Sequence, residues 1–85
     1  MKPSSIPALV DALAAEVKER RAELEITQED LAHKSGLDRP YVSLMEVGRK
    51  QPTLSVLFRL AYGLDLTLEE LAGRIERRYG RHTPD

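Results

Sequence analysis

Two short helical patterns meet across a tight turn in residues 28–47, which read QEDLAHKSGLDRPYVSLMEV. Gly36 lies between them and suits the left-handed backbone conformation that such a turn requires, because glycine has no Cβ atom to clash. Ala32 is small enough to let the second helix approach the first, and Val42 and Met45 provide apolar contacts between them. This combination predicts a helix-turn-helix. The alternative is an ordinary antiparallel helix hairpin, which needs neither small residue at this separation.

The rest of the chain is also predicted to be helical, because apolar residues recur at three- and four-residue steps and do not alternate as in strands. The predicted helices cover about residues 6–24, 28–35, 39–47, 54–64 and 67–79. Their expected N-caps carry side-chain oxygens that accept from backbone N–H groups: Ser4 or Ser5, Thr27, Asp38, Thr53 and Thr67. The predicted fold is all-α, a compact domain of five helices with the helix-turn-helix in the second and third.

Composition limits the class of protein. A chain of 85 residues is expected to form one domain over residues 1–85, and its core must be aliphatic because it has no Trp and one Phe. Cysteine is absent, which excludes disulfides and thiolate metal sites and fits a reducing cytoplasm. No apolar run approaches the ~18 residues of a membrane span. Polar residues interrupt the N-terminal stretch too often for a signal peptide.

Charge is segregated along the chain, although the formal net charge is only −1 and the isoelectric point is near 6.1. Between residues 39 and 59 four basic residues face one acid, Glu46. The acids gather instead in residues 16–30 and 65–70. Binding of a charged partner depends more on where the charges lie than on the net charge of the whole chain.

Catalytic chemistry has little support in the sequence. The only histidines are His33 and His82, which lie far apart, and no phosphate-binding loop or metal-ligand spacing is present. We therefore expect no enzyme activity, no metal and no cofactor.

Residues 15–72 resemble the lambda-repressor-like, or Xre, family of helix-turn-helix regulators. The matching segments are RR at 20–21, TQEDLA at 27–32, SGL at 35–37, YVS at 41–43, ME at 45–46, GR at 48–49, PTL at 52–54 and LA at 60–61. The resemblance implies a transcriptional regulator that binds double-stranded operator DNA as a homodimer, with a recognition helix at about 39–47 in the major groove. A phage-type repressor, a restriction-system controller and an antitoxin remain open as roles, and residues 28–43 favour the controller.

The resemblance assigns base reading to the outward face of the recognition helix, at Arg39, Pro40, Ser43 and Leu44. Arg39 is the strongest candidate, because arginine pairs bidentately with guanine O6 and N7. Leu44 forms no hydrogen bonds and would at best meet a thymine methyl. The alternatives are that Arg39 is a solvated surface charge and that Leu44 is half-buried core.

Contacts to the DNA backbone, which position a protein without reading sequence, are expected from four residues: Gln28, Tyr41, Arg49 and Lys50. Gln28 opens a helix, where free N–H groups and the helix dipole favour a phosphate. Otherwise Tyr41 only covers the preceding helix, and Arg49 and Lys50 form a plain polar loop.

A structural pair is also implied, between Arg21 late in the first helix and Glu46 at the end of the recognition helix. The sequence departs from the family pattern at two single positions and in residues 73–85, which run past the common end of the domain. Glu25 stands where a glycine is usual after the first helix, and Val47 replaces a basic or polar residue before Gly48.

The dimer interface is expected where apolar residues remain after the core is filled, at Tyr62, Leu64, Leu68, Ile75 and Tyr79. The last helix runs beyond the family core into residues 73–85, and its arginines are expected to pair with Glu69, Glu70 and Glu76. The alternatives are a chain that stays monomeric until it meets DNA and a module that binds a protein partner, such as a toxin.

Overall fold

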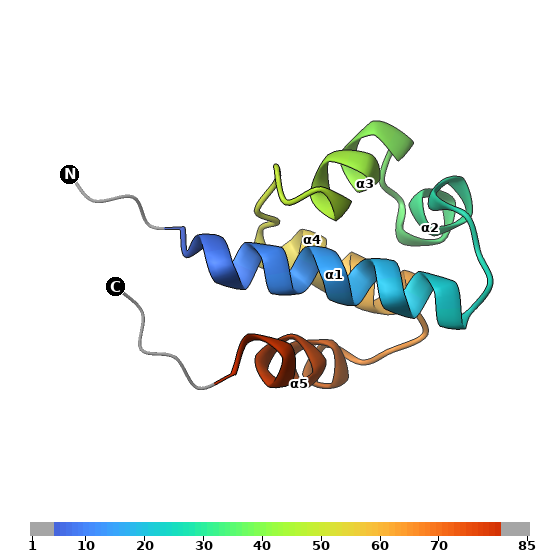
Figure 1. Cartoon of the computed structure of the whole chain (residues 1–85). Coiled ribbons are helices and arrows are strands. Elements are labelled where there is room, and N and C mark those ends of the chain that lie inside the picture. Colours follow the sequence, from blue (N-terminus) through green and yellow to red (C-terminus); the bar gives the residue numbers. More distant parts are fainter. Residues whose placement is uncertain (1–4, 81–85) are drawn as a thin grey trace.

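The computed structural model describes residues 5–80 and contains five α-helices in that range. They are α1 (Pro7–Glu23), α2 (Gln28–Ser35), α3 (Arg39–Glu46), α4 (Leu54–Gly63) and α5 (Leu68–Tyr79). In Figure 1, α1 lies across the middle of the molecule, with α2 and α3 on one side and α5 on the other. The described residues contain no strand, and the predicted all-α fold of five helices is confirmed.

Local hydrogen bonds define where α2, α3, α4 and α5 begin, and at α4 the Thr53 side chain accepts from the Val56 N–H. The Thr27 and Thr67 side chains accept from backbone N–H groups in the first turn. The Asp30 and Glu70 side chains in turn accept from the backbone N–H groups of Thr27 and Thr67, which completes two capping boxes. These hydrogen bonds from the N-cap backbone hold the pKa of both carboxyls below the usual range. Asp38 accepts from the Tyr41 N–H at 2.8 Å, as predicted.

The first helix begins differently from the prediction. Its N-cap is Ile6, with no side-chain cap, and Pro7 occupies the first position of α1. Ser5 does not act as the cap, and Ser4 lies outside the described residues. Proline suits this position because its missing N–H would have no partner inside the helix.

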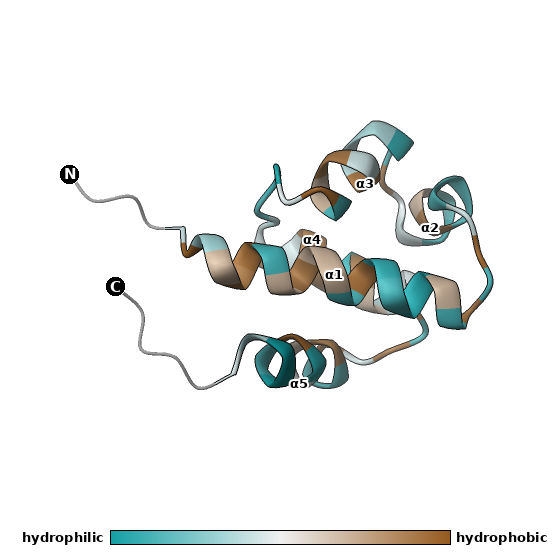
Figure 2. Cartoon of the chain, in the orientation of Figure 1, coloured by the Kyte–Doolittle hydropathy of each residue, from teal (hydrophilic) through white to brown (hydrophobic). Residues whose placement is uncertain are grey.

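The core is aliphatic, as predicted, and every helix contributes to it. The largest fully buried side chains are Val17, Leu31, Val42, Met45, Leu60, Leu64 and Leu71. Each helix also keeps a polar side, and Figure 2 shows hydrophilic and hydrophobic residues alternating along the ribbons. Burial of each large aliphatic side chain contributes about 1.5–3 kcal/mol, so this core orders the helices around α1.

Gly36 and Glu25 adopt left-handed backbone conformations in turns, and Gly63 lies where two helices pack closely. Gly36 is left-handed, with φ 70°, and closes the turn between α2 and α3. A Cβ atom on Gly63 would lie 3.0 Å from Leu31 Cδ1 and from Ser35 Cβ, so α4 crosses α2 closely. Glu25 itself adopts the left-handed conformation, with φ 56°, at the place where the family usually has glycine.

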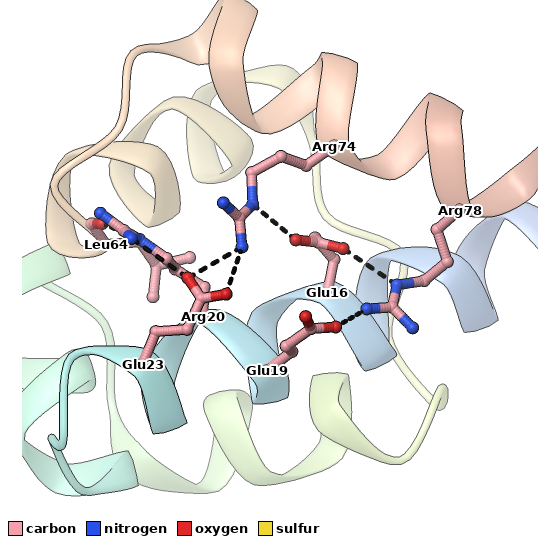
Figure 3. A network of polar contacts seen from close by, with 7 residues as sticks. All are labelled: Glu16, Glu19, Arg20, Glu23, Leu64, Arg74 and Arg78. Atoms are coloured by element: carbon pink, nitrogen blue, oxygen red, sulfur yellow. Dashed lines mark hydrogen bonds and ion pairs between the residues drawn. The ribbon is translucent and has the colours of Figure 1, made fainter.

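A network of ion pairs fastens α5 to α1 (Figure 3). Glu16 is buried and accepts from Arg74 Nε at 2.5 Å and from Arg78 Nε at 2.9 Å. Burial alone would raise the pKa of Glu16, but the hydrogen bonds from the two arginines hold it below its ordinary value. Arg74 also pairs with Glu23, and Arg78 with Glu19.

These contacts correct the expected partners of the α5 arginines. Arg74 and Arg78 pair with carboxylates of α1 in the same protomer and not with Glu69, Glu70 or Glu76. The physical reason is that α5 folds back along α1 and brings the arginines over its acidic side. No described helix is long and apolar enough to cross a membrane.

Candidate nucleic-acid interface

The four predicted base-reading residues share the solvent face of α3. Arg39, Pro40, Ser43 and Leu44 are all exposed, whereas Val42, Met45 and Glu46 are buried on the opposite side. Leu44 is 39% exposed and is not part of the core cluster. The helix therefore presents these side chains outward together, as a recognition helix requires.

A basic corner, which we define as Arg49 and Lys50, follows α3 directly. Both side chains are exposed, and the turn that carries them is made by Gly48 with φ 78°. Lys50 Nζ lies 6.0 Å from the centre of the Tyr41 ring. The ring packs partly on the core, and its burial raises the pKa of the Tyr41 hydroxyl. Tyr41 thus covers the domain and also steadies a cation beside the recognition helix.

Gln28 occupies the first position of α2, but its side chain is already engaged. Its Nε2 donates to Glu46 Oε1 at 3.0 Å. An amide nitrogen carries two hydrogens, so one donor remains for a further acceptor such as a phosphate.

The structural pair is a two-point contact between α1 and the end of α3. Arg21 Nε lies 2.8 Å from Glu46 Oε2, and Arg21 Nη2 lies 3.1 Å from Glu46 Oε1. The hydrogen bonds that Arg21 donates to Glu46 raise the pKa of Arg21. The Glu46 side chain is only 2% exposed and also accepts from Gln28. One carboxylate therefore holds three helices in register beneath the recognition face.

The charge segregation predicted from the sequence has a spatial counterpart. The cations of α3 and the basic corner are exposed, on the opposite side of α1 from α5 (Figure 1). The buried Glu16 and the exposed Glu23 lie on the side of α1 that meets the arginines of α5. The net charge of −1 therefore does not describe the face that carries α3.

The predicted dimer interface is wrong in two of its five residues. Leu64 is 0% exposed and Ile75 is 7% exposed, so both belong to the core of one protomer. They are covered because α5 packs along α1 instead of projecting from the domain. Tyr79 packs partly against the same core, Leu68 is half-buried, and Tyr62 is 70% exposed.

Sequence reasoning missed two other exposed apolar residues, Leu54 and Phe58. They are 73% and 60% exposed, and with Tyr62 they recur every four residues along α4. We call these three residues the α4 stripe. The spacing was visible in the sequence, but a second apolar series on the same helix fills the core and hides the signal. A shallow groove beside the stripe is lined by His33, Gly36 and Leu68, among others.

Val47 was also missed as a surface residue of the recognition helix. It caps the C-terminus of α3 and is 63% exposed. The sequence signal was its position, four residues after Ser43 and three after Leu44, which places it on the same helical face.

Comparisons with known proteins agree with this geometry. A family model described as helix-turn-helix, HTH_3, matches residues 17–71. The control protein C.MunI from Mycoplasma sp is 37% identical over 60 residues, which cover 71% of this chain and 81% of that protein.

Two similar solved structures are restriction-modification controller proteins. C.Esp1396I is 31% identical with a TM-score of 0.79, covering 87% of this chain and 96% of that one. C.AhdI from Aeromonas hydrophila is 35% identical with a TM-score of 0.70, covering 73% and 94%. A further C.Esp1396I structure is a tetramer in complex with its natural 35 base-pair operator. The chain therefore belongs to the Xre-type helix-turn-helix family.

Proposed function

We propose that this protein regulates transcription by binding operator DNA sequence-specifically, with α3 in the major groove. The observation that carries the proposal is the solvent face of α3. It presents Arg39 and Ser43 outward and is followed directly by the exposed cations of the basic corner. Base-edge contacts and phosphate contacts are thus available on one side of the domain, which a helix-turn-helix needs in order to dock.

The regulated genes are proposed to be those of a restriction-modification system. The support is the similarity to C.Esp1396I and C.AhdI, which are named as restriction-modification controller proteins, and to C.MunI, which is named as a control protein. The operator is then expected upstream of the protein's own gene, beside genes for a DNA methyltransferase and an endonuclease. Footprinting of that upstream region tests the assignment, and protection of no site there would contradict the controller role.

The proposed binding is expected to depend steeply on salt. Arg49 and Lys50 from two subunits supply about four phosphate contacts, and each releases about 0.9 counterions from duplex DNA. The logarithm of the binding constant should therefore fall with the logarithm of salt concentration with a slope of about −3 to −4. Fluorescence anisotropy with a labelled duplex measures it. A flat slope, or no binding to any duplex at low salt, would contradict DNA binding and favour a protein-interaction module.

The proposed division between reading and positioning gives a second expected result. Arg39→Ala should weaken binding to the selected site by about 1–3 kcal/mol and relax the preference at one base pair, because arginine reads guanine. Arg49→Ala should weaken selected and random duplexes to the same extent. Titrations of both variants on both duplexes make the comparison, and identical behaviour of the two variants would refute the division.

The operator-bound form is proposed to be a homodimer, because one recognition helix reads one half-site and paired domains read two about a helical turn apart. We place the interface on the α4 stripe with Leu68. A twofold interface must be self-complementary. The rim of this surface carries charges of both signs, the exposed cation Arg59 and the pair of Lys34 with Asp65, whose atoms lie 3.4 Å apart within one protomer. Two exposed aromatic rings supply most of the apolar area that a partner would cover.

A further inference from the structure

The centre of the recognition face is apolar. Pro40, Leu44 and Val47 lie on one side of α3, since they are separated by three, four and seven positions. All three are exposed, Leu44 by 39% and Val47 by 63%. Ser43 is the only hydrogen-bonding side chain among the exposed residues that lie between them on this face.

A major groove offers such a face one kind of apolar partner. Adenine, guanine and cytosine present hydrogen-bond donors and acceptors there and no methyl group, whereas thymine also presents its 5-methyl group. An aliphatic side chain pressed against a polar base edge removes water and returns no hydrogen bond, which is unfavourable. Against a thymine methyl the same side chain buries apolar surface on both partners.

We propose that Leu44 and Val47 select thymine in each operator half-site by packing on its 5-methyl group. Val47 thereby becomes a specificity-determining residue of the interface. This inference rests on the proposed function, which places α3 in the major groove. The exposed cations Arg39, Arg49 and Lys50 around the apolar centre favour DNA over a protein partner, because they suit a polyanion.

The geometry of α3 also limits where the thymine lies. Arg39 and Val47 are eight positions apart, which is about 12 Å along a helix. Base pairs follow one another at about 3.4 Å. The thymine read by Val47 should therefore lie about two to four base pairs from the guanine read by Arg39, depending on how far the helix tilts in the groove.

The test uses the duplex that the wild-type chain selects from random DNA, synthesised with uracil in place of each thymine in turn. Uracil lacks only the 5-methyl group. At one or two positions of each half-site, uracil should weaken binding about fourfold per methyl removed, and about 15-fold when both half-sites carry it. At other thymines the change should stay within twofold. This arm needs no protein variant.

Variants then assign the methyl contact to its side chain. Leu44→Ala and Val47→Ala should each abolish the uracil sensitivity at one position, and thermal unfolding should show that both variants fold. Ser43→Ala is the matched control on the same face. It should weaken thymine and uracil duplexes alike and so leave their affinity ratio unchanged.

The possible failures are distinguishable. If the wild type binds its selected duplex but uracil is neutral at every position, methyl reading is refuted while the proposed function stands. If the sensitivity persists in the Leu44→Ala, Val47→Ala double variant, another side chain reads the methyl and the assignment is refuted. If no duplex is selected at all, both this inference and the proposed function fail.

Discussion

Phe58→Asp should convert a dimer to a monomer and weaken operator binding by about 10²–10⁴-fold. Phe58 is the middle residue of the α4 stripe and is 60% exposed in the protomer, so the change spares the core. In an interface built on this stripe, a carboxylate at this position would be buried among apolar side chains, which is unfavourable for a charge. Affinity for the operator falls because, without the dimer, binding of a second domain to the second half-site is no longer intramolecular.

Light scattering at micromolar concentration should give a mass near twice 9.6 kDa for the wild type and near 9.6 kDa for the variant. Binding to a single half-site should be nearly unchanged, which separates lost pairing from a damaged recognition helix. Ala72→Asp is the matched control, because it places the same charge at an exposed position in the middle of α5. If Ala72→Asp dissociates the dimer and Phe58→Asp does not, the interface lies on α5. A wild-type monomer would overturn the dimer itself.

Arg21→Ala should cost about 3–5 kcal/mol of folding stability. The Glu46 side chain is 2% exposed in the intact pair, and removing the arginine leaves Gln28 as its remaining side-chain donor. Removing one partner of a buried ion pair leaves the other charge unpaired in surroundings that solvate it poorly. Folding stabilities of native domains are only about 5–15 kcal/mol in total, so the variant should be close to unfolding.

Urea unfolding followed by circular dichroism measures this effect. Lys18→Ala is the control, since Lys18 is exposed on the same helix and surface changes usually stay within about 0.5 kcal/mol. The double variant Arg21→Met, Glu46→Leu removes both charges and should regain much of the loss. A cost below about 1 kcal/mol for Arg21→Ala would mean that the pair does not organise the recognition helix.

Features that depend on neighbouring residues could be predicted from the sequence. The capping boxes at Thr27 and Thr67, the left-handed Gly36 and the outward face of α3 all follow from contacts within a few positions of the chain. Hydrogen bonds and helical spacing at that range are the same in every fold. This is why the helix-turn-helix and the exposed Arg39 were predicted at the residues where the structure has them.

Only the tertiary structure decided which apolar residues face inward. α4 carries two apolar series at helical spacing, and the sequence does not distinguish the one that packs on the core from Leu54, Phe58 and Tyr62, which face solvent. The choice depends on the close crossing of α2 at Gly63 and on the arginines that draw α5 onto α1. Those contacts join residues more than 25 positions apart, so periodicity within one helix carries no information about them. Leu64 and Ile75 were therefore expected at a surface that the fold buries.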